Sequence, residues 1–168
     1  AGLKLGSQPI TAIAYSRLNH TVRPPFSCED GGEIAMKGFH DDIEKLTTGN
    51  SDFRRVLYTG KNIQLVLMTL QPGDEIGAEV HEDRDQFFRF EEGDGRVDID
   101  DNTYIVVDGS GIIVPAGSRH YGRNTGSQLL KLYTLYAPPE HKDGVVQSTK
   151  AEAEARHHDE EWDGATTE

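Results

Sequence analysis

Residues 79–93 read EVHEDRDQFFRFEEG, and residues 109–124 read GSGIIVPAGSRHYGRN. Both stretches combine histidine, the commonest metal-binding side chain, with glycines or a proline at turn positions. Apolar runs rich in strand-forming residues stand beside both of them. Together the two stretches indicate a metal pocket built on a β-scaffold.

Strand-like runs continue on both sides of these stretches. From Phe53 onward the chain is rich in Val, Ile, Leu, Thr and Tyr, and turn-forming residues interrupt it about every ten residues. In one clear unit Val97 and Ile99 alternate with charged residues, and Asp101 and Asn102 supply the chemistry of a hairpin turn. This spacing predicts an all-β fold of antiparallel strands, either a sandwich or a barrel.

Smaller elements are expected on either side of the β-region. Residues 1–30 hold an apolar stretch and then a turn with prolines, which we interpret as an N-terminal arm. Acidic residues begin DDIEKLTTG at 41–49 and a glycine ends it, as in a short helix. The charged, alanine-rich segment 141–168 predicts a peripheral C-terminal helical tail. The domain itself is expected over residues 31–140.

Composition excludes several classes of partner. The 29 acidic and 17 basic residues give a formal net charge of −12, which disfavours binding to nucleic acid or to an anionic membrane. The sequence has neither a run long enough to span a bilayer nor the pattern of a signal peptide. Cys28 is the only cysteine, so an intramolecular disulfide is impossible and a reducing, cytoplasmic location is expected.

Four residues are candidate metal ligands. Glu79 and His81 are two apart on a predicted strand, so their side chains leave the same face. Gln86 opens the next strand, and His120 follows the turn that Pro115 and its neighbours form. Two imidazoles, a carboxylate and an amide oxygen suit one divalent ion, either Mn, Fe, Zn, Ni or Co.

The pattern of these residues resembles that of the cupin family. The second cupin motif is complete, with each residue at the family's spacing: Gly109, Pro115, Gly117, His120 and Asn124. The resemblance covers about residues 53–139 and implies a double-stranded β-helix, also called a jelly roll or cupin barrel, with a short helix before it and a helical tail after it.

The first cupin motif departs from the family pattern. Counting back from Gly93 places Gln86 where the family has glutamate, His81 on the second histidine of the pattern and Glu79 on the first. His81 and His120 therefore carry over as expected ligands. Ligation by Glu79 and Gln86 is inferred from their position; a rim carboxylate and a hydrogen-bonding amide are the alternatives.

Several functions fit this resemblance. The sequences of the motifs are similar to those of the mannose-6-phosphate isomerase-like group of cupins. This similarity implies a proton shift on a sugar or sugar phosphate, with Tyr133 as the candidate proton carrier. An Fe(II)-dependent dioxygenase and a non-catalytic module that binds a small molecule are the alternatives. We also expect a homodimer, because the apolar arm can protect a strand edge.

The remaining histidines and two arginines are weaker candidates. No ligand-spaced motif contains the other histidines, which are His20, His40, His141, His157 and His158. Arg54 and Arg55 are candidates for binding a substrate phosphate, but ion pairing at the surface of an acidic protein is the simpler expectation.

Overall fold

The computed structural model describes residues 36–156 and 159–168. The predicted N-terminal arm, residues 1–30, lies outside them. The described elements, in chain order, are α1 (Ile43–Gly49), β1 (Arg54–Thr59), β2 (Gln64–Leu70), β3 (Glu75–Val80), β4 (Asp85–Glu92), β5 (Gly95–Ile99), β6 (Asn102–Val106), β7 (Gly111–Val114), β8 (Arg119–Asn124), β9 (Leu130–Ala137), β10 (Val146–Gln147) and α2 (Lys150–Arg156).

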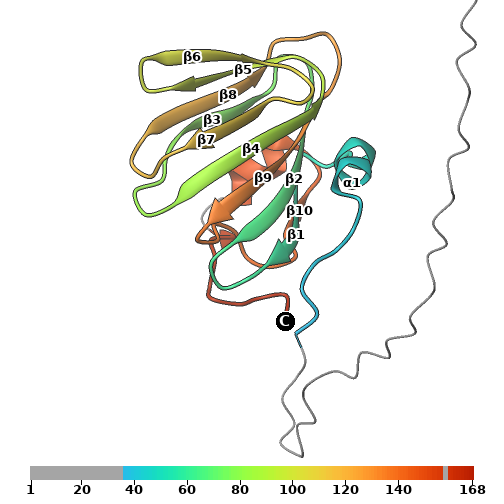
Figure 1. Cartoon of the computed structure of the whole chain (residues 1–168), viewed down its shortest axis with the longest axis vertical. Helices are drawn as coiled ribbons and strands as arrows, with labels where there is room; N and C mark the ends of the chain where they lie inside the picture. The colour runs from blue at the N-terminus through green and yellow to red at the C-terminus, as the bar shows by residue number, and fades with distance from the viewer. Residues whose placement is uncertain (1–35, 157–158) are drawn as a thin grey trace, which may run out of the picture. The chain divides into compact units, whose positions relative to one another are not determined.

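The strands form two antiparallel sheets (Figure 1). One has six strands in the order β10-β1-β2-β9-β4-β7, and the other has four in the order β3-β8-β5-β6. Consecutive strands often lie in different sheets, as expected for a jelly roll rather than a simple meander. The predicted all-β class and cupin-type architecture are confirmed.

The core lies on the inner face of the six-stranded sheet. In β4 and β9 buried residues alternate with more exposed ones, so that Phe88, Phe90 and Leu132 point inward. The central strand β2 is buried along its whole length. Its outer face is covered near α1, where the Asn50 side chain donates a hydrogen bond to Thr69 Oγ1 at 2.9 Å. The inward faces of these strands enclose the site.

The local signals for a helix and a hairpin produced the expected elements. Asp42 caps α1, and its carboxylate accepts a hydrogen bond from the backbone N–H of Lys45 at 3.1 Å. The strands β5 and β6 form the predicted hairpin, and Ile99 pairs with Asn102. The turn therefore consists of Asp100 and Asp101, one residue earlier than expected, and Asp100 takes a positive φ of 48°.

The C-terminal segment is part of the β-structure and not a peripheral tail. β10 pairs with β1 at the edge of the six-stranded sheet. In α2 Ala153 is 4% exposed and belongs to the hydrophobic core, although its neighbours are charged. The expectation of a solvated tail over 141–168 is thus corrected, because a single small residue anchors the helix. None of the helices in the described part of the chain has the length and apolar character to cross a membrane.

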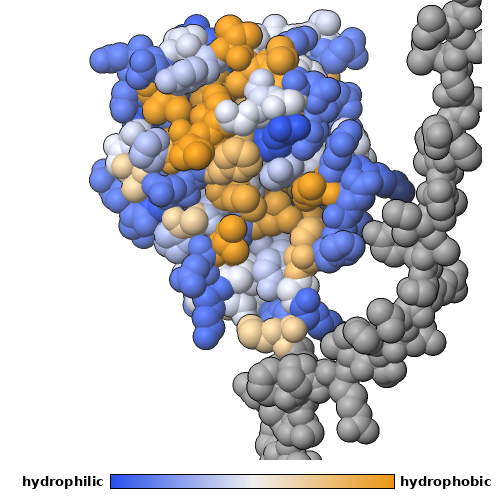
Figure 2. Space-filling view, viewed as in Figure 1, coloured by the Kyte–Doolittle hydropathy of each residue, from blue (hydrophilic) through white to orange (hydrophobic). Residues whose placement is uncertain are grey.

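Some hydrophobic side chains remain at the surface (Figure 2). Ile105 on β6 is 72% exposed and Ile113 on β7 is 68% exposed. Both strands lie at the end of their sheet. This region is therefore the apolar part of a surface that is otherwise rich in charge.

Candidate metal centre

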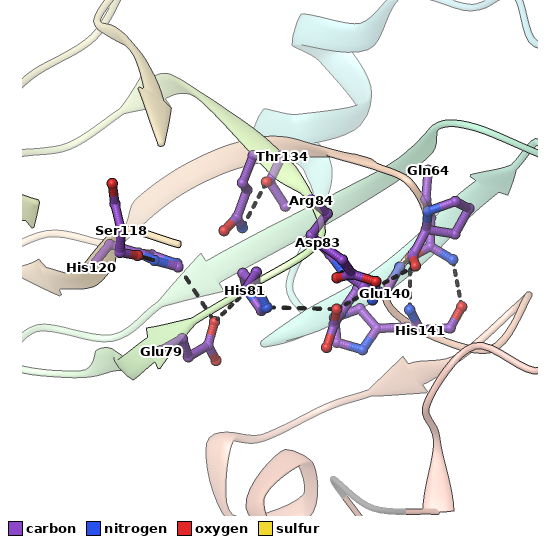
Figure 3. Close-up of polar contacts among 12 residues, drawn as sticks. Gln64, Glu79, His81, Asp83, Arg84, Ser118, His120, Thr134, Glu140 and His141 are labelled. Atoms are coloured by element: carbon purple, nitrogen blue, oxygen red, sulfur yellow. Dashed lines mark hydrogen bonds and ion pairs between the residues drawn. The ribbon is translucent and has the colours of Figure 1, made fainter. Parts of the chain in front are cut away.

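Two neighbouring strands bring three of the predicted ligands together. Glu79 on β3 pairs directly with His120 on β8. His81 follows the last residue of β3 and lies two residues from Glu79, so both side chains leave the same face (Figure 3). The β3–β8 register shifts between Ile76 and Glu79, and irregularities of this kind often re-aim side chains near functional sites.

The distances fit one shared ion. Glu79 Oε2 lies 3.3 Å from His81 Nε2 and 3.8 Å from His120 Nε2. The three ligand atoms all lie within 4.8 Å of one another. Ligands held at about 2.1 Å from one ion lie roughly 3 to 3.5 Å apart, so the two distances from Glu79 are already close to this spacing.

The site contains buried polar atoms that no protein group satisfies. Within the described residues, His81 Nε2, His120 Nε2 and Gln86 Oε1 are buried and make no hydrogen bond. Leaving such an atom unsatisfied costs about 1–3 kcal/mol, so a native site is expected to provide a partner. A cation would satisfy the imidazole nitrogens and the amide oxygen, because all three can donate a lone pair.

Acceptors behind each imidazole fix its orientation. His120 Nδ1 lies 3.4 Å from the carbonyl oxygen of Ser118. His81 Nδ1 lies 3.6 Å from Glu140 Oε2, and Glu140 in turn pairs with Arg84 at 2.5 Å. A proton on each Nδ1 leaves Nε2 as the lone-pair atom facing the site, the usual arrangement for a metal-binding histidine.

The protonation states also suit a cation. Burial lowers the pKa of His120 and so favours the neutral imidazole that a metal requires. Burial alone would raise the pKa of Glu79, but the contact with His81 and the charge of Arg54 outweigh it, and the pKa is lowered. Glu79 is therefore an anion and His120 is neutral at neutral pH.

A turn ties the two motif stretches together. The N–H of Gly117 donates a hydrogen bond to the carbonyl of His81 at 2.8 Å, and the N–H of Ala116 donates one to the Asp85 carboxylate at 2.9 Å. Gly117 has a φ of 81°, which a residue with a Cβ adopts only at a cost. The glycine of the second motif therefore helps to place a ligand of the first.

Gln86 lies on the inner face of β4 and is 1% exposed. Its Nε2 donates a hydrogen bond to Thr134 Oγ1 at 3.0 Å, which fixes the amide so that Oε1 is the atom without a partner. Gln86 is therefore buried with an amide oxygen that makes no hydrogen bond in the described part of the chain, and its ligation of a metal stays a prediction.

Tyr133 does not share this face. Its ring packs against Phe87 with centroids 6.3 Å apart, on the side of β9 opposite to Thr134 and Tyr136. Tyr136 is 1% exposed, and its ring centroid lies 5.8 Å from that of His81. Burial strongly raises the pKa of Tyr136, so its phenol keeps its proton. Sequence analysis missed Tyr136, because two tyrosines three apart on a strand point to opposite faces and the sequence does not show which face is inward.

Two hollows flank the three clustered ligands. Glu79 lines a cavity of about 230 Å³ between β1, β3 and α2. On the other side His81 lines a second cavity of about 290 Å³, together with Arg84 and Glu140. His141 is buried near Tyr136, and His40 is exposed; His20, His157 and His158 lie outside the described residues. Two of the three clustered ligands, Glu79 and His81, therefore each line a hollow at the surface.

Comparison with known proteins agrees with this geometry. The model of the family described as "Cupin domain" matches residues 66–136, which contain all four predicted ligands. The uncharacterised protein YrkC of Bacillus subtilis (strain 168) is 45% identical over 129 residues, which cover 73% of this chain and 69% of YrkC. The chain belongs to the cupin family.

Two further similar proteins extend the comparison. The crystal structure of BH2720 from Bacillus halodurans is 45% identical, with a TM-score of 0.70, and the match covers 71% of this chain and 95% of BH2720. The uncharacterised protein L612 of Acanthamoeba polyphaga mimivirus is 36% identical over 109 residues, which cover 62% of this chain and 68% of L612. These likenesses establish the family and leave the reaction open.

In this chain the carboxylate of the first cupin motif stands at a different position from that in the family pattern. Glutamine occupies position 86 on β4, and the acid of the cluster is Glu79 on β3, which lies in the other sheet. The site therefore keeps a single negative charge among its ligands. Asn124 of the second motif has a structural role, because its amide donates hydrogen bonds to the carbonyls of Leu70 and Gln128 at 2.9 and 2.8 Å.

Proposed function

We propose that this chain is a metal-dependent cupin enzyme that acts on a small, oxygen-rich metabolite. Glu79, His81 and His120 would hold one divalent ion, with Gln86 Oε1 as a fourth ligand. The observation that carries the proposal is the set of buried lone-pair atoms without hydrogen-bond partners around Glu79.

The bound ion would act as a Lewis acid on a carbonyl or hydroxyl oxygen. The metal set (Mn, Fe, Zn, Ni or Co) follows from the mixed nitrogen and oxygen ligands. The similarity to mannose-6-phosphate isomerase-like cupins makes a proton shift on a sugar or sugar phosphate the leading reaction. Tyr136, buried beside His81, is better placed than Tyr133 to hold a proton for it. The single cysteine, Cys28, supports a reducing compartment such as the cytoplasm.

A second candidate function follows from the ligand composition. Two histidines and one carboxylate are the set found in Fe(II) oxygenases, which leave coordination positions open for oxygen and substrate. In that case Gln86 would serve as a hydrogen-bonding residue in the pocket rather than as a ligand. The identity of the metal separates the two functions.

Metal binding is tested by calorimetry and elemental analysis of the full chain. We expect one divalent ion per chain, and we expect His81→Ala and His120→Ala each to weaken binding by at least 100-fold. His40→Ala is the matched control, because His40 is exposed and away from the cluster. Equal binding by all three variants would contradict the proposed centre.

The reaction is tested with the metal-loaded protein. Conversion of aldoses to ketoses with Mn(II) or Zn(II) under nitrogen supports the isomerase, whereas oxygen uptake that requires Fe(II) supports the oxygenase. A fully loaded protein that is inert in both assays, yet binds a small molecule in a His81-dependent way, would support the non-catalytic module instead.

A further inference from the structure

Arg54 is a buried cation that the proposed metal centre does not use. It begins β1 and is only 5% exposed. The next residue, Arg55, points the other way and forms an ion pair with Asp52 at 2.6 Å. The expected surface ion pairing therefore holds for Arg55 and not for Arg54.

The guanidinium of Arg54 has no acidic partner among residues 36–156 and 159–168. Its Nη1 donates a hydrogen bond to the neutral Gln147 Oε1 at 3.0 Å, and its Nε is buried without a hydrogen bond. Arginine is almost never fully buried unless it is paired, because burying an isolated charge is costly. An unpaired buried guanidinium therefore indicates a place for an anion.

Arg54 lines the same cavity as Glu79, one of the three clustered ligands. It is the hollow of about 230 Å³ between β1, β3 and α2. A ligand in this cavity can therefore meet both the guanidinium and the metal-binding carboxylate.

The other charged groups of the cavity are one cation, Lys150, and two carboxylates, Glu75 and Glu154. Lys150 Nζ lies 3.3 Å from Glu75 Oε1 and 3.6 Å from Glu154 Oε1. Glu75 also accepts a hydrogen bond from Tyr121. With Arg54 and Glu79 included, two cations and three carboxylates leave the cavity with one excess negative charge. A divalent ion bound at Glu79 would change this to one excess positive charge.

We propose that Arg54 binds the anionic oxygen group, a carboxylate or a phosphate, of a ligand whose other end reaches the metal centre. A guanidinium can hold two such oxygens side by side, with more direction than an ammonium group. The contact between the ligand and the metal rests on the proposed function. The contact between its anionic group and Arg54 is argued separately, from the burial of Arg54. The substrate class thereby narrows to small anionic hydroxy or carbonyl compounds.

The test is an NMR titration of the full chain that follows the Arg54 Nε–H signal and the amides of Gly77 and Ala78. The probes are acetate, inorganic phosphate and acetamide, the last being a neutral analogue of acetate. We expect acetate or phosphate to shift these signals saturably and acetamide to leave them unchanged. The anion that shifts them tells a carboxylate site from a phosphate site.

Three variants complete the experiment. Arg54→Gln should weaken anion binding by at least tenfold, Arg54→Lys should retain part of it, and Arg55→Gln, which removes an equal charge from the outer face, should change it little. Equal responses to acetate and acetamide in the unmodified chain would overturn the proposal. The same holds for a folded Arg54→Gln variant that binds the anion as tightly as the unmodified chain.

A parallel titration with Zn(II) keeps the two proposals apart. Zinc binding is followed on the ring signals of His81 and His120, and the anion titration is repeated with and without zinc. An anion response at Arg54 without zinc binding would refute the metal centre alone. Zinc binding without an anion response would refute the role of Arg54 alone.

Discussion

Glu140 is the residue whose position most directly affects a ligand without being one. Its carboxylate lies 3.6 Å from His81 Nδ1 and pairs with Arg84 on its other side. Acceptors behind a metal-binding histidine fix the ring and raise its basicity. Glu140→Gln should therefore weaken divalent metal binding by about 10- to 100-fold, measured by calorimetry.

The matched control for Glu140 is Arg84→Gln. This variant breaks the same ion pair but leaves the acceptor behind His81 in place. We expect a smaller effect on metal affinity than for Glu140→Gln. If both variants lose the same affinity, the ion pair and not the carboxylate–histidine contact supports the site.

At this scale the sequence predicts ligands better than it predicts their surroundings. Glu79 and His81 were identifiable because a spacing of two on a strand fixes a shared face, and His120 because a turn with Pro115 precedes it. The burial of Arg54 and the contact of Glu140 with His81 were not identifiable, because the partners Gln147 and His81 are distant in sequence. Contacts of this kind depend on strand pairing, which local patterns do not reveal.

The turn before β8 is an element whose shape the metal centre requires. Gly117 takes a φ of 81° there and donates a hydrogen bond to the His81 carbonyl. A side chain at positive φ costs about 1–2 kcal/mol, and the turn would shift to relieve it. Gly117→Ala should lower stability by that amount in urea unfolding and also weaken metal binding.

Gly49→Ala is the control for this turn. Gly49 ends α1 at an ordinary φ, and nothing lies within 4 Å of an added Cβ. We expect unchanged metal binding and no loss of stability. A Gly117→Ala variant as stable as Gly49→Ala would show that the turn tolerates a side chain.

α2 shows how little sequence signal a packed helix can carry. Its residues are mostly charged or alanine, which predicts a solvated helix, yet Ala153 is 4% exposed and joins the core. Ala153→Asp would bury an unpaired carboxylate, so we expect a loss of about 2 kcal/mol or more in urea unfolding.

Ala155→Asp adds the same charge to the exposed side of α2. It should change stability by no more than about 0.5 kcal/mol. Similar effects of the two substitutions would mean that α2 is not anchored through Ala153.

For the molecule as a whole, the sequence predicted the antiparallel all-β architecture because strand-like runs recur about every ten residues with Gly, Pro, Asn or Asp between them. It did not predict which strands lie at the edges of the sheets, since that depends on the order in which the strands pair within each sheet. The structure identifies β6 and β7 as end strands, and these strands carry Ile105 and Ile113.

Exposed apolar residues on end strands favour association with a second copy. An end strand presents unpaired backbone groups, and side chains such as Ile105 add apolar area that water solvates poorly. The predicted homodimer can therefore form through this surface, whereas the arm proposed from the sequence lies outside the described residues.

Light scattering after size exclusion should give a dimer for the unmodified chain and a monomer for the double variant Ile105→Lys, Ile113→Lys. Ile63→Lys is the control, because Ile63 is 45% exposed in the loop between β1 and β2 and should leave the dimer intact. An unmodified chain that is monomeric at high concentration would remove the dimer, and a double variant that stays dimeric would move the interface elsewhere.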